Sequence, residues 1–91
     1  MDGPDLGSAR FTLGTKEKHV ILVDYWGALW FGRTEIVVDG KEVVNGQHWW
    51  LGPRSYHFDV GDSEPHKVEL RIGTLGRKFE LYVDGEFAGS A

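Results

Sequence analysis

The sequence predicts an all-β fold, a small antiparallel β-sandwich of about eight strands. Apolar and polar residues alternate in several short segments, and no window shows the helical apolar period of about 3.6 residues. Two Asp-Gly pairs, at 39–40 and 84–85, lie between such segments. Asp-Gly favours a type I′ hairpin turn, because both central residues of that turn need positive φ.

The expected strands differ in how clear their pattern is. The clearest covers 66–72, where Val68, Leu70 and Ile72 alternate with charged residues. Segment 19–25 is instead an almost continuous apolar run. The other strands are expected at 10–13, 34–38, 41–44, 47–51, 55–60, 78–83 and 86–88.

Length and composition limit the function classes. A chain of 91 residues predicts one domain, here 9–91, after a disordered lead-in at 1–8 that is rich in Gly, Pro, Asp and Ser. The net charge of −4 and the lack of a basic cluster argue against nucleic acid as a partner. No apolar run approaches the length of a membrane span, and the N-terminus lacks the apolar core of a signal peptide. The absence of cysteine excludes disulfides and thiolate chemistry and is compatible with a cytoplasmic location.

The chain also contains an internal repeat. TEIVVDGKEV (34–43) matches FELYVDGEFA (79–88) position by position, and upstream of each lies a strand that begins with histidine, His19 or His66. Each copy is therefore predicted to form a strand, a turn, a second strand, an Asp-Gly turn and a short third strand. The copies differ most in the first turn, which is polar in the second copy (GTLG, 73–76) and aromatic in the first (WGALWFG, 26–32).

A register for each hairpin assigns its residues to two faces. In the second hairpin, a turn at 73–76 pairs Ile72 with Arg77 and leaves one apolar and one charged face. In the first hairpin, a two-residue II′ turn at 27–28 pairs Trp26 with Leu29. The expected core face then holds Ile21, Val23, Tyr25, Trp30, Thr34 and Ile36. The opposite face holds Val20, Leu22, Trp26, Leu29, Phe31 and Val37, together with Asp24, Arg33 and Glu35.

The first hairpin thus has apolar side chains on both faces, and we expect something to cover the second face. Three covers are possible: segments 10–13 or 47–51 of the chain itself, a second copy in a homodimer, or a foreign partner. The pair Trp49-Trp50 bears on this choice, because adjacent strand residues point to opposite faces. One of the two should enter the core and the other should emerge beside His48.

An ordered series of motifs resembles the Fas apoptosis inhibitory molecule family. The series is HVILV (19–23), VDGKE (38–42), Trp49 or Trp50, FDVG (58–61), the strand at 66–72 and YVDGE (82–86). The resemblance covers about 19–87 and implies a compact β-sandwich without enzymatic activity. It further implies protein interactions that restrain apoptosis and influence NF-κB signalling, or that protect against aggregation. The first turn of that family is usually polar, whereas here it is aromatic.

No set of residues predicts catalysis, a cofactor or a metal. The histidines lack helical i, i+4 spacing, and His19 and His66 stand at equivalent strand starts, where a structural role is expected. Ser55 and His57 on one strand lack an orienting acid. The acidic residues of segment 59–64 lack the spacing of a calcium loop and indicate a solvated turn.

These observations predict a non-enzymatic protein-interaction module that binds through its first hairpin. The partner-binding residues are expected to be Trp26, Leu29, Phe31, Trp49 and Trp50. The bound partner would be another protein or a second copy of the chain. The alternative is a carbohydrate-binding module that stacks sugar rings on exposed tryptophans; such a site requires flat, coplanar rings rimmed by Asp, Asn or Gln.

Overall fold

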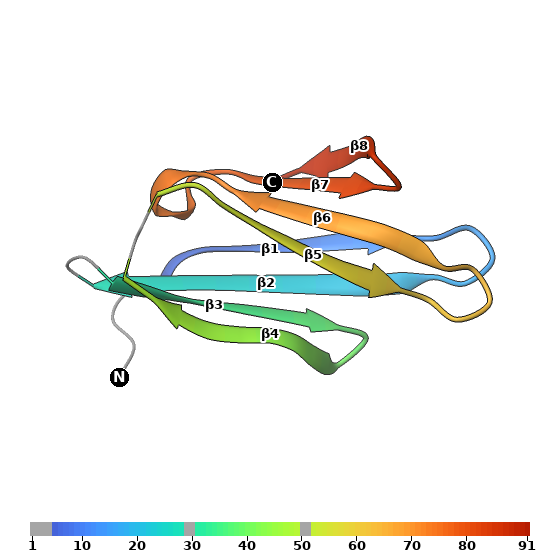
Figure 1. Cartoon of the computed structure of the whole chain (residues 1–91), viewed down its shortest axis with the longest axis horizontal. Helices are drawn as coiled ribbons and strands as arrows, with labels where there is room; N and C mark the ends of the chain where they lie inside the picture. The colour runs from blue at the N-terminus through green and yellow to red at the C-terminus, as the bar shows by residue number, and fades with distance from the viewer. Residues whose placement is uncertain (1–4, 29–30, 50–51) are drawn as a thin grey trace.

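Figure 1 shows the computed structural model of the chain, in which two antiparallel sheets pack face to face. The structure describes residues 5–28, 31–49 and 52–91. Within them, the first sheet has the order β1 (Asp5–Leu13), β2 (His19–Ala28), β3 (Phe31–Val38) and β4 (Lys41–His48). The second sheet has the order β5 (Arg54–Val60), β6 (His66–Ile72), β7 (Phe79–Val83) and β8 (Glu86–Ser90). The predicted all-β sandwich is confirmed.

Two expected boundaries are wrong. Strand β1 begins at Asp5, and its residues Gly7 and Ser8 pair with β2, so 5–8 are part of the first sheet rather than of a disordered lead-in. Residues 1–4 lie outside the described residues. The two strands expected at 41–44 and 47–51 are one strand, β4, with a bulge where the pairing shifts between Ile36 and Val37.

Each sheet is one copy of the internal repeat. The repeat unit has four strands, one more at its N-terminal end than the sequence pattern indicated. Both predicted hairpin turns are present: φ is 51° at Asp39 and 81° at Gly40, and 52° at Asp84 and 85° at Gly85. Within each sheet, every strand pairs with its neighbours in sequence, and the chain passes from the first sheet to the second once, between β4 and β5.

The expected registers are wrong, although the expected faces are right. Gly27 pairs with Gly32 inside the β2–β3 ladder, so the turn does not lie at 27–28. In the second sheet Ile72 pairs with Phe79 rather than with Arg77, because the turn η1 (Thr74–Gly76) reaches further along the chain. Each error shifts the pairing by an even number of residues. An even shift leaves every side chain on its original face.

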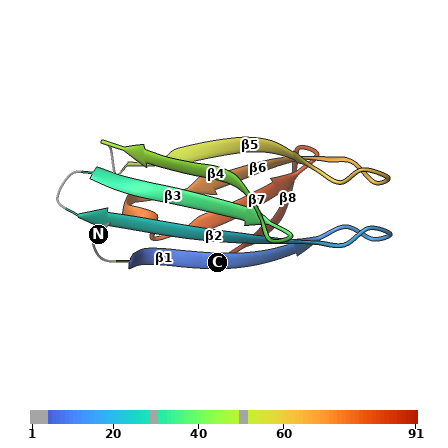
Figure 2. The same cartoon turned by 90° about the horizontal axis from the view of Figure 1, so that it is seen from below.

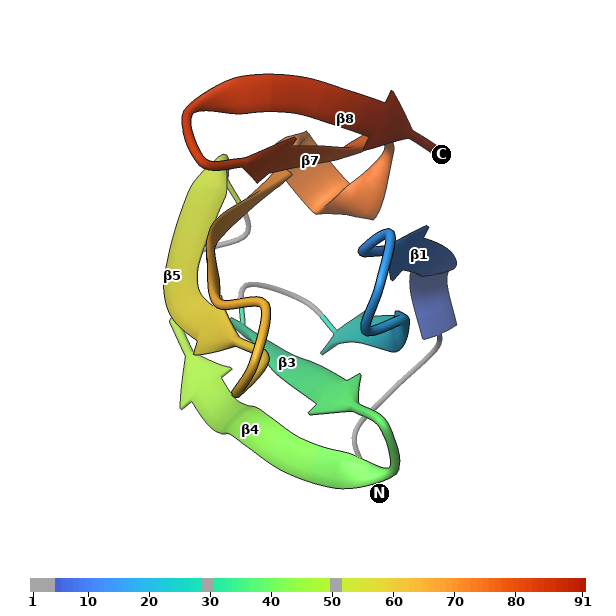
Figure 3. The ribbon, with the colours of Figure 1, turned by 90° about the vertical axis from the view of Figure 1, so that its right-hand side faces the viewer.

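The core lies between the two sheets, which face each other when viewed along the strands (Figure 3). The predicted core residues of the first hairpin that the structure describes are all buried: Ile21, Val23, Tyr25, Thr34 and Ile36. Trp30 lies outside the described residues. The second sheet contributes Val60, Val68, Leu70, Ile72, Phe79 and Leu81. Each large apolar side chain that is buried in this way contributes roughly 1.5–3 kcal/mol of transfer free energy.

Candidate interaction surface

Three aromatic side chains lie at one end of the outer face of the first sheet. Trp26 on β2 and Phe31 on β3 are partly exposed, and Trp49, directly after β4, is 71% exposed. The rings of Phe31 and Trp49 are in contact, with 5.6 Å between centroids and 52° between their planes. We call Trp26, Phe31 and Trp49 the aromatic end.

The aromatic end contains three of the five predicted binding residues. Leu29 and Trp50 lie outside the described residues. Segment 10–13 does not cover this face, because it is a strand in the plane of the same sheet. Segment 47–51, the other segment expected to cover this face, contributes Trp49, which packs on Phe31 but is itself mostly exposed.

His48 explains why Trp49 points outward. His48 is 6% exposed; its Nε2 lies 3.0 Å from Thr34 Oγ1, and its ring centroid lies 5.5 Å from that of Tyr25. Successive strand residues point to opposite faces, so burial of His48 directs Trp49 to solvent. One residue of the pair at 49–50 thus emerges beside His48 in the chain, as expected, while His48 itself lies on the opposite, buried face.

A row of acidic side chains adjoins the aromatic end on the same face. Asp24 on β2 is paired directly with Glu35 on β3, and Glu35 in turn with Asn45 on β4. Glu42 accepts a hydrogen bond of 3.0 Å from Asn45 Nδ2. We call Asp24, Glu35 and Glu42 the acidic row.

The acidic row is short of compensating charge. Desolvation, then the side-chain hydrogen bond and charge of Glu42 and the charge of Asp24, raise the pKa of Glu35, and the charge of Arg33 opposes this only in part. Arg33 stands beside the row, where its Nε and Nη2 donate to Asn45 Oδ1 at 2.9 and 2.6 Å. Among the described residues, neither Asp24 nor Glu35 forms a salt bridge with a lysine or arginine. Sequence reasoning missed this row, because the expected register did not place Asp24 opposite Glu35.

The outer face of the second sheet is different. Arg71 is paired directly with Glu80, and its Nε lies 2.6 Å from Glu69 Oε2. The Arg71 guanidinium also stacks 4.2 Å from the centroid of the Tyr82 ring. Tyr82 contacts Phe87 edge to face, and Phe87 is 57% exposed. This face is the charged face that the sequence predicted, with carboxylates and cations in opposite-charge pairs.

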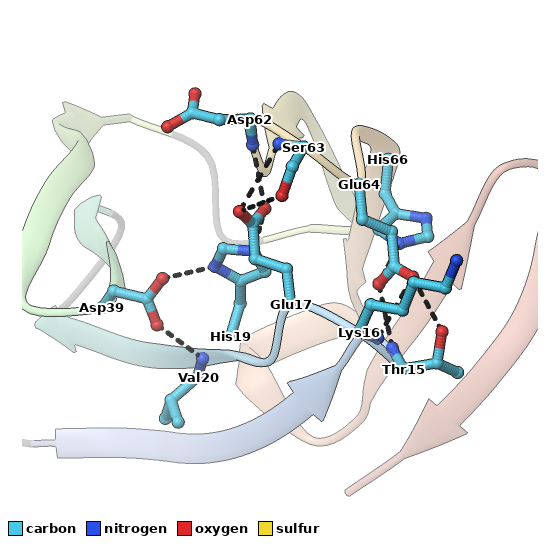
Figure 4. Close-up of polar contacts among 10 residues, drawn as sticks. All are labelled: Thr15, Lys16, Glu17, His19, Val20, Asp39, Asp62, Ser63, Glu64 and His66. Atoms are coloured by element: carbon cyan, nitrogen blue, oxygen red, sulfur yellow. Dashed lines mark hydrogen bonds and ion pairs between the residues drawn. The ribbon is translucent and has the colours of Figure 1, made fainter.

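A second polar cluster joins the two sheets at the opposite end from η1, where the β1–β2 and β5–β6 loops lie side by side (Figure 2). Glu17 of the first loop accepts hydrogen bonds from Asp62 N at 2.9 Å and Ser63 Oγ at 2.9 Å (Figure 4). Glu64 of the second loop accepts from Thr15 N at 2.9 Å and Thr15 Oγ1 at 2.7 Å. Each loop thus inserts one carboxylate into the backbone of the other. We call this reciprocal pair the carboxylate clasp.

The clasp carboxylates are strongly stabilised in their charged form. The Asp62 backbone amide, then the His19 side chain and Ser63, lower the pKa of Glu17 to about 2. The Thr15 hydroxyl and amide, then the Lys16 amide, lower the pKa of Glu64 to about 2. Hydrogen bonds from backbone amides favour a carboxylate over the protonated acid. The acidic loop at 59–64 therefore uses Glu64 for this inter-sheet contact.

The two predicted structural histidines complete the clasp. His19 contacts Asp39 through Nδ1 and Glu17 through Nε2, the latter at 3.0 Å, and these two carboxylates raise its pKa. Asp39 also accepts a hydrogen bond of 2.9 Å from Val20 N. The second copy repeats this set with His66, Asp84, Glu64 and Lys67. Both histidines therefore hold the Asp-Gly turns to the loops, as expected of a structural role.

The other polar groups form no comparable site. Ser55, His57 and Asp59 are exposed on β5, and no hydrogen bond joins Ser55 to His57 in the described part of the chain. No group of three or more His, Asp or Glu side chains that could hold a metal ion occurs in residues 5–28, 31–49 and 52–91.

Fold and surface together define a small antiparallel β-sandwich with one distinctive aromatic and acidic face. Comparisons with protein-family models, with curated proteins and with solved structures found no match to this chain. In the described residues, no helix is long and apolar enough to cross a membrane.

Proposed function

We propose that this chain is a non-enzymatic protein-interaction module whose binding surface is the aromatic end. The observation that carries the proposal is Trp49, which is 71% exposed although the neighbouring His48 is buried and an aromatic partner, Phe31, lies next to it. Large aromatic side chains supply most of the binding free energy at the centre of protein interfaces. Asp24, Arg33 and Glu35 form the polar rim that such a centre needs.

One observation favours a protein partner over a carbohydrate. The planes of Phe31 and Trp49 differ by 52°, whereas stacking of sugar rings calls for a flat, coplanar platform. The resemblance to the Fas apoptosis inhibitory molecule family also supports binding rather than catalysis. Regulation of apoptosis or NF-κB signalling, or protection against aggregation, in the cytoplasm is the cellular role that we propose on that resemblance. The cysteine-free sequence accords with it.

Affinity selection from a random-peptide phage library tests the proposal while the partner is still unidentified. We expect the wild type to enrich peptides that carry large apolar side chains and Trp49→Ala to lose this enrichment. Phe87→Ala is the matched control, because it removes an exposed aromatic side chain that also contacts another ring at 5.6 Å, on the other sheet. Equal enrichment by all three proteins would contradict the proposal. A shift of tryptophan fluorescence on titration with soluble oligosaccharides, abolished by Trp49→Ala, would favour the carbohydrate function instead.

Self-association through the same surface has its own measurement. Light scattering coupled to size-exclusion chromatography should show whether wild type dimerises and whether Trp26→Asp, which places a charge at the aromatic end, converts a dimer to a monomer. If both proteins are monomers of equal stability, a second copy is not the partner and the surface is left for a foreign protein.

A further inference from the structure

We infer that the partner presents an extended segment in which a cationic side chain, Arg or Lys, stands two residues from a large apolar one. The apolar side chain would rest on the aromatic end and the cation on the acidic row. This inference rests on the proposed function, because it specifies the partner of that same surface.

The spacing follows from the geometry of the sheet. Asp24 and Trp26 are alternate residues of β2 and lie on the same outward face. Alternate residues of a strand are about 6.6–6.8 Å apart along it. A ligand strand has the same repeat, so residues i and i+2 of an extended segment match the acidic row and the aromatic end together.

Charge complementarity selects a cation for the acidic row. Asp24 and Glu35 are directly opposite across two strands, and like charges in that position destabilise a sheet. Glu42 adds a third carboxylate, which is close enough to Glu35 to disfavour its ionisation. An arriving guanidinium or ammonium group would relieve this repulsion, whereas a carboxylate would increase it.

The fold itself does not require the like-charge pair. The equivalent pair of the second sheet is Arg71 and Glu80, which have opposite charges on the same scaffold. The nearest cation of the first sheet, Arg33, is held by two hydrogen bonds to Asn45. The repulsion between Asp24 and Glu35 therefore has no equivalent at Arg71 and Glu80 in the second sheet. It occurs on the same face as the exposed aromatic side chains.

The aromatic side chains strengthen the same choice. A guanidinium is planar and can bind a carboxylate while it stacks on an aromatic ring. The second sheet contains this arrangement within the chain, since Arg71 contacts Glu69 and stacks on Tyr82. On the first sheet Asp24 occupies the position equivalent to Arg71. The arginine on this face, Arg33, is paired with Trp26 further along β2 and donates to Asn45. The partner would supply a cation between Asp24 and Glu35.

Three synthetic peptides test the inference on the full chain. The first repeats Ser-Arg-Thr-Leu twice; the second has Glu in place of Arg; the third has Ser in place of Leu. Binding is followed by two-dimensional NMR of the labelled protein, with the indole of Trp49 and the amide of Glu35 as reporters. We expect the first peptide to bind at least about tenfold more tightly than either of the others and to weaken as salt is added.

Glu35→Lys should reverse the preference toward the acidic peptide, and Glu80→Lys, at the equivalent position of the second sheet, should leave it unchanged. Glu35→Lys places opposite charges across the β2–β3 pair, so the variant is expected to fold, and its NMR spectrum confirms this directly. If the acidic peptide shifts Trp49 as strongly as the basic one, the inferred chemistry is wrong while the aromatic docking surface stands. Absence of any shift with all three peptides also contradicts the inference, and the phage selection then decides the proposed function by itself.

Discussion

The two sheets are built from one repeated unit. The residues by which they contact each other are equivalent in the two copies, whereas the side chains on their outer faces differ. Both have a histidine at the start of the second strand, an Asp-Gly turn and a clasp carboxylate, in equivalent places. Their outer faces hold a like-charge pair in one case and an opposite-charge pair in the other. The shared features are those that fold the sandwich, because each sheet depends on the other for its loops and its core.

The side chains of the outer faces are not needed to join the sheets, so the differences between these faces indicate function. On the face with Arg71 and Glu80, both residues form salt bridges within the same hairpin. The exposed aromatic side chain there, Phe87, contacts Tyr82. On the other face, Asp24 and Glu35 form no salt bridge with a lysine or arginine of the described residues, and Trp49 is largely exposed. The two halves should therefore respond equally to substitutions where they fold and unequally where they bind.

The largest effect is expected at the glycines that open the clasp loops. A Cβ at Gly14 would lie 1.9 Å from Glu17 O, and one at Gly61 would lie 2.3 Å from Glu64 O. Gly14→Ala and Gly61→Ala should each lower the free energy of unfolding by about 3 kcal/mol, since steric overlap adds to positive φ. Chemical denaturation of the two variants measures this.

The turn glycines Gly40 and Gly85 are the matched controls. They also have positive φ, but an added Cβ would meet nothing within 4 Å. Gly40→Ala and Gly85→Ala should therefore lower the unfolding free energy only by the left-handed backbone strain of about 1–2 kcal/mol. Losses at Gly14 or Gly61 no larger than at their controls would show that the two loops are not tightly packed.

A smaller effect is expected on removal of the clasp charges. Glu17→Gln and Glu64→Gln weaken charge-assisted hydrogen bonds to the opposite loop without a change in size. We expect comparable decreases in melting temperature for the two variants, because the contacts are reciprocal. In the double variant the losses should not add, since the two loops hold each other. A loss confined to one variant would mean that the clasp is not symmetric.

The clasp also sets a pH window for stability. The pKa of Glu17 and of Glu64 is lowered from 4.5 to about 2, so their contribution is complete above the unfolded value and is lost as pH falls toward 2. The pKa of His19 and of His66 is raised above 6.5, so their contribution is complete below 6.5 and is lost as pH rises through the folded value. We expect the clasp contribution to be greatest between about 4.5 and 6.5.

Thermal unfolding across pH measures this window. His19→Gln and His66→Gln should flatten the alkaline limb and leave the acid limb in place. An alkaline limb that persists in the double histidine variant would assign that pH dependence to other groups.

The smallest effect is expected for charge reversal on the outer faces, and its sign should differ between the two sheets. Glu35→Lys turns a like-charge cross-strand pair into an opposite-charge pair and should raise the unfolding free energy by about 0.5 kcal/mol. Glu80→Lys does the reverse opposite Arg71 and should lower it by a similar amount. Urea denaturation at low salt resolves the two signs. If both substitutions destabilise, Glu35 has a structural role that the pairing does not explain.

Residue patterns were sufficient to predict much of this molecule. Alternation and the Asp-Gly pairs predicted the sandwich, the repeat and the two faces of each hairpin, because the side-chain period of a strand is two whatever its partner. The same reasoning predicted that Trp26 and Phe31 belong to the outward face and that one residue of the pair at 49–50 emerges.

Which residues stand opposite one another was decided only by the tertiary structure. The sequence indicated a turn at 27–28, and the structure instead pairs Gly27 with Gly32, which brings Asp24 opposite Glu35. Likewise, nothing in the spacing of Glu17 and Glu64 indicated that each would bind the loop of the other sheet. A local pattern determines the direction of a side chain, whereas its partners depend on loop lengths and on how two separate sheets pack together.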